Sequence, residues 1–209
     1  MNAAKVQLSK EELALVSDPG WILTKNSIME RAVGLLAALS EDISGELRVL
    51  RGELEVFNGE GELLPLNWAT PKISKGENYL GLPYVVLDYP RLFRREDVLA
   101  IRTMFWWGHY FSVTLHLKGR YKDLFLPVIK SCLPQLMEAN FHIAVSGDEW
   151  RHEVEVDNYT LLQAEGMHMA EGSPFLKLSA KCLLDKWNEA PAILLGLNKL
   201  LIRVLIARR

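Results

Sequence analysis

The sequence predicts an α+β fold in which N-terminal helices and a long C-terminal helix pack against a largely antiparallel sheet of two hairpins and two flanking strands. Three observations lead to this prediction. Apolar residues recur at helical spacing near the N-terminus, and they recur at the same spacing near the C-terminus. Between these two regions, residues 99–117 alternate around a glycine as a hairpin does. We expect one domain over residues 1–209, with 1–57 as a helical N-terminal subregion and 58–82 as a long loop.

Three helices are predicted at the N-terminus. Ser9 followed by Glu12 has the spacing of a capping box, which starts a short helix over residues 10–16. Asp, Pro and Gly then end this helix, because proline lacks an amide proton and glycine favours a turn. Apolar residues three and four apart indicate a second helix that ends near residue 41 and a third over residues 43–57.

The segment 58–82 has no helical spacing and is rich in glycine and proline, which indicates an irregular loop. A loop of this length is either a binding element or a solvated connection between the helices and the sheet. Residues 72–76 within it are basic like a phosphate-contacting loop, but they lack the glycine spacing of a P-loop. A strand is predicted next, over residues 84–88 between two prolines.

The aromatic stretch 99–117 predicts the central hairpin. Gly108 suits the first position of a two-residue turn completed by His109, because glycine takes a positive φ without strain. This turn pairs Trp106 with Phe111. The predicted register places Met104, Trp106, Phe111, Val113, Leu115 and Leu117 on one face and Thr103, Ser112, Thr114 and His116 on the other.

A helix and a second hairpin are predicted after the central hairpin. Helical spacing covers residues 122–138, and Pro134 should kink the helix or shorten its last turn. The second hairpin would turn at Gly147–Asp148 and place His142 opposite Glu153 on a solvated face.

The last strand and the last helix are predicted to pack against each other. Residues 175–184 alternate apolar and polar side chains, as in a sheet that is covered on one side. Residues 189–207 have a broad apolar face that requires cover, and the sheet is the simplest surface to provide it.

Arg102 is the most informative single candidate for function, because the hairpin register surrounds it with apolar side chains. A buried guanidinium needs an acidic partner, and Asp88 on the neighbouring predicted strand could accept two hydrogen bonds from it. The pair would then be structural. The alternative is that Arg102 binds the anionic end of a ligand.

The aromatic side chains of the hairpin are candidates for an apolar pocket or for a partner interface. Trp106, Trp107 and Tyr110 are the residues we place at such a site. Asp88, Arg102 and His116 form the cluster that an enzyme would use, although no catalytic role is assigned.

Metal and cofactor motifs are missing from the sequence. The five histidines show no paired metal-ligand spacing, and we expect neither a metal nor a cofactor. Cys132 and Cys182 lack redox or zinc spacing and are interpreted as reduced core residues.

Composition limits the partners. The chain is 49% apolar, so it can bury a sizeable core, and its formal charge of −2 provides no field for holding nucleic acid. We find neither a secretory signal nor about 20 consecutive uncharged apolar residues, so we expect a cytoplasmic protein without a membrane span.

Three functional hypotheses follow from the sequence. The first is a module that binds a small apolar or amphipathic ligand between the sheet and the C-terminal helix, with Arg102 at its anionic end. The second is a homo-oligomeric or partner-binding interaction protein. The third is an enzyme that acts on a small polar substrate through Asp88, Arg102 and His116.

Overall fold

The protein has an α+β fold with one antiparallel sheet, seen in a computed structural model that describes residues 6–57 and 70–206. Within these residues the strand order is β1-β2-β3-β4-β7-β5-β6. The strands are β1 (Lys72–Tyr79), β2 (Leu82–Phe93), β3 (Val98–Trp106), β4 (Tyr110–Lys118), β5 (His142–Ala144), β6 (Tyr159–Leu161) and β7 (Phe175–Leu183). The helices are α1 (Lys10–Ser17), α2 (Pro19–Asp42), α3 (Ser44–Phe57), α4 (Arg120–Ser131), α5 (Leu133–Glu138), α6 (Ala164–Gly172) and α7 (Ala190–Ile206).

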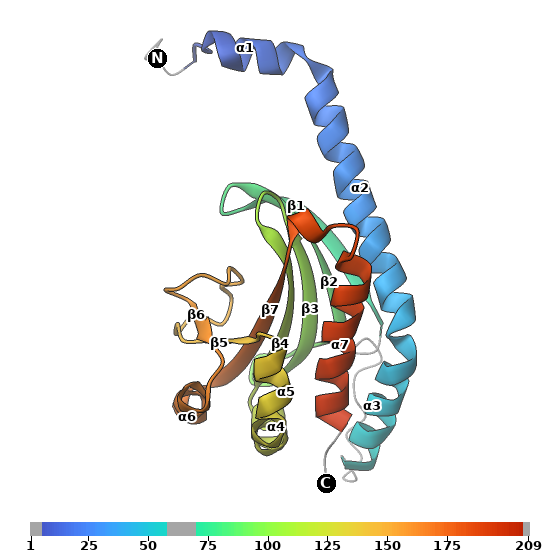
Figure 1. Cartoon of the computed structure of the whole chain (residues 1–209), viewed down its shortest axis with the longest axis vertical. Coiled ribbons are helices and arrows are strands. Elements are labelled where there is room, and N and C mark those ends of the chain that lie inside the picture. The colour runs from blue at the N-terminus through green and yellow to red at the C-terminus, as the bar shows by residue number, and fades with distance from the viewer. Residues whose placement is uncertain (1–5, 58–69, 207–209) are drawn as a thin grey trace.

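One face of the sheet carries α2, α4 and α7 (Figure 1). Helix α7 contacts β4 and β7, α2 contacts β2, and α3 packs against α7. Their apolar stripes meet alternate residues of the strands, and side chains such as Leu36, Phe111, Leu115 and Leu201 are completely buried between the two layers. Burial of apolar surface, at about 25 cal/mol per Å², therefore holds the C-terminal helix on the sheet as the sequence predicts.

Most helix and strand predictions are confirmed. Ser9 accepts a hydrogen bond from the backbone N–H of Glu12, whose side chain accepts one from Ser9 N–H, so the predicted capping box begins α1. The predicted helix 122–138 divides after Ser131 into α4 and α5, because Pro134 opens the second of them. Strand β7 and helix α7 lie where they were predicted.

The predicted loop 58–82 is wrong for its second half. Residues 72–79 form β1, which pairs with β2 from Lys72 opposite Asp88 to Tyr79 opposite Leu82. Glycine and proline in the sequence conceal the strand, and the pairing with β2 overrides the poor local propensity. Residues 58–69 of the predicted loop lie outside the described residues.

The predicted register of the central hairpin is wrong by one residue. The turn has three residues, with Gly108 in the middle at φ +76°, and Trp106 therefore pairs with Tyr110 rather than with Phe111. A shift of one residue moves every side chain of β4 to the opposite face relative to β3. Arg102 and Trp106 consequently share their face with His116, while Phe111 lies in the core.

The predicted second hairpin is also wrong. Strand β5 pairs with β6 and with β7, and residues 145–158 between β5 and β6 form a long loop instead of a returning strand. We call this loop the strap. Glu153, which the sequence places on a solvated face opposite His142, is buried within it.

Gly108 and Gly119 provide a matched test of the turns, because both have positive φ values of +76° and +58°. A Cβ at position 108 would meet no atom within 4 Å, whereas one at position 119 would lie 2.3 Å from the carbonyl oxygen of Glu96. Gly108→Ala should therefore cost only the left-handed backbone strain, about 1 kcal/mol in the free energy of unfolding. Gly119→Ala should cost more, about 3 kcal/mol, because the backbone must also shift.

Urea unfolding of the two variants and the wild-type protein measures these free energies. If Gly108→Ala and Gly119→Ala lost the same free energy of unfolding, the described path of the chain around Gly119 would be contradicted.

Candidate functional site

The second face of the sheet combines a small apolar cluster with polar side chains, and most of these polar side chains are buried as well. Side chains that alternate with the core residues of β3, β4 and β7 point to this face, and the strap covers them (Figure 1). Lys177 is 1% exposed and His116 is 4% exposed. Burying such groups costs free energy unless each one finds a polar partner, so the contacts of the strap determine what this face can do.

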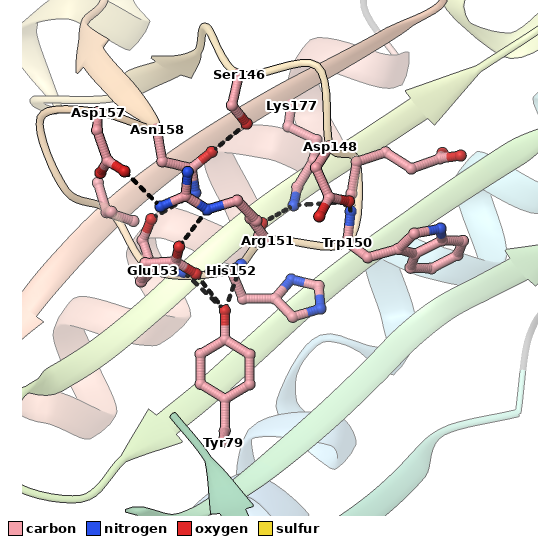
Figure 2. A network of polar contacts seen from close by, with 12 residues as sticks. Tyr79, Ser146, Asp148, Trp150, Arg151, His152, Glu153, Asp157, Asn158 and Lys177 are labelled. Carbon is pink, nitrogen blue, oxygen red and sulfur yellow. Dashed lines mark hydrogen bonds and ion pairs between the residues drawn. The ribbon is translucent and has the colours of Figure 1, made fainter. Parts of the chain in front are cut away.

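Two strands bind the strap through its backbone. The Lys177 ammonium group on β7 donates hydrogen bonds to the carbonyl oxygens of Glu149 and Arg151 (Figure 2). Four residues further along β7, Lys181 donates to the carbonyl oxygen of Val154 at 3.2 Å. The N–H of Val154 in turn donates to the hydroxyl of Tyr110 on β4 at 2.7 Å. The middle of the strap is therefore attached to the sheet.

Side-chain contacts attach the strap to two further strands. The hydroxyl of Tyr79 at the end of β1 donates to the buried carboxylate of Glu153 and accepts the backbone N–H of His152 at 2.7 Å (Figure 2). Burial and the neighbouring carboxylate raise the pKa of Tyr79 to about 12, which keeps it a donor. On the opposite side, Glu149 contacts His116 at 3.1 Å and Lys118 at 2.7 Å. These contacts bind the strap to β1 and β4.

The ion pair that the sequence indicates between Arg102 and Asp88 is present. Arg102 Nε and Nη2 donate to the two carboxylate oxygens of Asp88 at 2.7 and 2.9 Å, and the residues are direct partners across β2 and β3. A third bond, of 2.7 Å, joins Arg102 Nη1 to Nε2 of His152 on the strap. The guanidinium group is thus fixed on both sides.

The bond from Arg102 determines the tautomer of His152. A guanidinium group only donates hydrogen bonds, so Nε2 of His152 must be the acceptor and the proton of the neutral ring must be on Nδ1. Burial and the positive charges of Lys177 and Arg102 lower the pKa of His152 to about 2, so the ring is neutral. Nδ1 is buried and has no hydrogen-bond partner among the residues that the structure describes.

Arg102 and His152 lie between two cavities. The larger, which we call the Arg102 cleft, has a volume of about 340 Å³ and is also lined by Lys72, Ser74, Tyr84, Asp88, Met104 and Trp150. The smaller contains about 10 Å³ and lies against His116, Thr114 and Lys177. Only the Arg102 cleft has the volume of a small-molecule site, whereas the smaller cavity has room for about one water molecule.

Burial changes the protonation of the groups under the strap. Desolvation lowers the pKa of the Lys177 ammonium group to about 7, and the positive charge of Arg102 acts in the same direction. Desolvation also lowers the pKa of His116, with the charge of Lys177 as the next cause. Lys177 therefore titrates near neutral pH while it binds the strap.

The structure brings some of the predicted site residues together. Arg102 and Asp88 line the cleft, and His116 lines the small cavity. Trp106 lies beside the cleft on the same face, where its indole N–H donates to the carbonyl oxygen of Tyr79. Trp107 does not belong to the site, because it packs against the core on the helix side.

Tyr110 binds the strap and does not line the Arg102 cleft. The predicted location of the pocket is also corrected, because buried apolar side chains fill the space between the sheet and α7. The one-residue shift of the hairpin explains this error, since it separates Arg102 from the face that α7 covers.

Sequence reasoning missed His152, Trp150 and Lys177. Lys177 could have been found, since it alternates with the apolar residues of β7 and shares a face with Arg102 once the register is correct. His152 and Trp150 carry no such signal, because the strap has no regular period and its position depends on contacts distant in sequence.

Comparison with known protein families, with curated proteins and with solved structures gives no match for this chain. Among the described residues, no helix combines the length and the apolar character needed to cross a membrane. The same residues contain no group of three or more His, Cys, Asp or Glu side chains placed to hold a metal ion. The function is therefore inferred from the cleft itself.

Lys177→Met should change how stability depends on pH. In the unfolded chain Lys177 has the ordinary pKa of 10.5 and keeps its proton up to that pH. In the folded protein its pKa is about 7, so it releases the proton above about pH 7. The free energy of unfolding of the wild-type protein should thus rise between pH 7 and 10, and Lys177 contributes at most about 1.4 kcal/mol per pH unit. The variant lacks this contribution and leaves two strap carbonyls without their donor, so it is also less stable.

Urea unfolding followed by tryptophan fluorescence at several pH values measures the slope of the free energy of unfolding against pH. Lys10→Met, which replaces an exposed lysine on α1, is the control and should keep the wild-type slope. A Lys177→Met variant with that same slope would show that Lys177 stays protonated in the fold.

Proposed function

We propose that the protein binds a small amphipathic carboxylate in the Arg102 cleft. The observation that carries this proposal is a buried donor, Nδ1–H of His152, which has no acceptor among the described residues and lies on the ring that Arg102 holds at the cleft. A buried donor without an acceptor costs about 1–3 kcal/mol, and an anionic ligand oxygen that accepts from Nδ1–H would remove this cost. The proposal keeps the first hypothesis from the sequence and moves its site to the other face of the sheet.

The geometry of Arg102 suits it to bind a carboxylate. A guanidinium group has five N–H donors, and Arg102 uses three of them on Asp88 and His152 in the described contacts. Asp88 fixes the plane of the group and offsets part of its charge, so the arginine can remain largely buried without a ligand. Two N–H groups remain for oxygen atoms of a ligand, and hydrogen bonds between charged groups are stronger than neutral ones.

The walls of the cleft favour an apolar body on the same ligand. Tyr84, Met104 and Trp150 provide aromatic and thioether surface, and Trp150 is 54% exposed. In Figure 2 the indole of Trp150 extends away from the strap, beyond the ring of His152. Lys72 contributes a second positive charge to the lining, which would attract an anion.

The enzyme hypothesis has weaker support. Asp88 already accepts two bonds from Arg102, and His116 already contacts Glu149. The cavity beside His116 has room for about one water molecule, which leaves no space for a substrate. Proton transfer by His116 would require the strap to open.

Small carboxylates test the proposal directly. Benzoate, phenylacetate and octanoate, titrated by calorimetry against the wild-type protein, should each bind more tightly than the corresponding neutral amide. His152→Phe keeps the ring but removes the Nδ1–H donor, and should weaken carboxylate binding by about ten- to a hundredfold, the value of a hydrogen bond to a charged group.

The matched control is His168→Phe, because His168 is an exposed histidine on α6, distant from the cleft. This variant should bind the carboxylates like the wild-type protein. The proposal would be refuted if the amides bound as tightly as the carboxylates, or if no carboxylate bound at millimolar concentration. It would also be refuted if His152→Phe and His168→Phe bound the carboxylates with equal affinity.

A further inference from the structure

An apolar arm projects from the body of the protein. It comprises residues 6–24, which include α1 and the first turns of α2, and Figure 1 shows it extending beyond the sheet. None of the described residues 10–17 is buried, and the first buried residue of α2 is Lys25. The arm exposes Val6, Leu8, Leu13, Leu15, Val16, Trp21, Ile22 and Leu23.

This exposed surface is larger than a monomer ordinarily presents. The eight residues together expose roughly 800 Å² of surface around α1 and the first turns of α2, whereas the largest contiguous apolar patch of a typical monomer is about 300–600 Å². The same area is about what each partner of a specific dimer buries. The eight-residue helix α1 is also too short to be stable on its own, so a surface that covers the arm would stabilise it.

The arm is held in a fixed direction. Lys25 at its base forms an ion pair with Glu77 on β1, and one turn later Glu30 pairs with Lys75 on the same strand. The indole N–H of Trp21 donates to the carbonyl oxygen of Leu15 at 2.9 Å, which attaches α1 to α2. The polar atom of Trp21 is therefore satisfied while its ring remains 49% exposed.

The same helix carries a groove suited to an aromatic ring. The groove lies between α2 and the start of α7, has a volume of about 280 Å³, and is lined by Leu35, Ala38, Leu39, Trp187 and Pro191 with Arg31 and Asp42. Trp21, Ile28 and Leu35 lie seven residues apart, which places all three on one stripe of α2. Trp21 of the arm and Leu35 of the groove therefore lie on the same side of α2.

We propose that two copies of this chain associate through antiparallel α2 helices, so that the arm of each copy covers the groove of the other. A twofold axis at Ile28 places that residue against its counterpart and places Trp21 opposite Leu35 of the second copy. In this dimer, Trp21 of each copy enters the groove of the other copy. A central aromatic anchor in an apolar pocket is the usual arrangement of an interface hot spot.

A second copy is the occupant that the structure favours, because the arm and the groove are complementary and belong to the same helix. An unrelated partner would have to match both surfaces or leave one of them exposed. The proposal is independent of the carboxylate site, which lies on the opposite face of the sheet from α7.

Sedimentation velocity over a range of protein concentrations measures the association. The wild-type protein should be dimeric at micromolar concentration, and Trp21→Asp should be monomeric because the groove then lacks its aromatic anchor. The control is Leu80→Asp, which changes a comparably exposed apolar residue in the turn between β1 and β2 and should leave the dimer intact. Circular dichroism should show folded protein for both variants.

Cysteine substitutions test the twofold axis. Ile28→Cys should form a disulfide-linked dimer on mild oxidation, whereas Asn26→Cys, at an exposed position on the other side of α2, should not.

A wild-type protein that is monomeric at all concentrations would overturn the proposal, and so would a dimer that Trp21→Asp leaves intact. Equal crosslinking at positions 26 and 28 would overturn the antiparallel arrangement. A monomer that binds neutral phosphatidylcholine vesicles through Trp21 would assign the arm to a lipid surface instead.

Discussion

The hydrogen bonds from Lys177 to the carbonyl oxygens of Glu149 and Arg151 are the interaction on which the polar half of the molecule depends. They place a buried amine between the sheet and the strap. Without the strap, the polar side chains of β4 and β7 would face water and no cleft would exist beside Arg102. Without these side chains, the strap would have no partner for its backbone.

This arrangement divides the sheet into two functional halves. The helix side is closely packed and apolar, and its contacts determine the position of the strands. The strap side is held by directional hydrogen bonds, which fix His152 and Arg102 relative to each other. Stability therefore comes mainly from the helix side, and the site that we propose lies on the strap side, where a rigid layer positions residues on a loop.

The sequence predicts the helices and β7 well because each has a clear period or a capping signal. It also predicts the pairing of Asp88 with Arg102, since a half-buried arginine on a central strand requires a carboxylate nearby. The error in the register of the central hairpin has a simple physical cause. A three-residue turn at Gly108 and a two-residue turn have similar local sequences, but they direct β4 to opposite faces.

The strap could not be predicted from local pattern at all. Its bends resemble a hairpin in sequence, and what prevents pairing is a set of contacts with Tyr79, Tyr110 and Lys177, which lie far away along the chain. The cleft forms only when these contacts are made. The donor groups of His152 and Arg102 that face it can therefore be identified only from the three-dimensional structure.

The most direct test of this account is the tautomer of His152, measured by nitrogen-15 NMR of the imidazole ring from pH 5 to 8. The account predicts a neutral ring throughout this range, with its proton on Nδ1 and with Nε2 accepting from Arg102. A ring protonated on Nε2, or one that becomes charged near pH 6, would contradict it, because the Arg102 cleft would then lack the donor assigned to it.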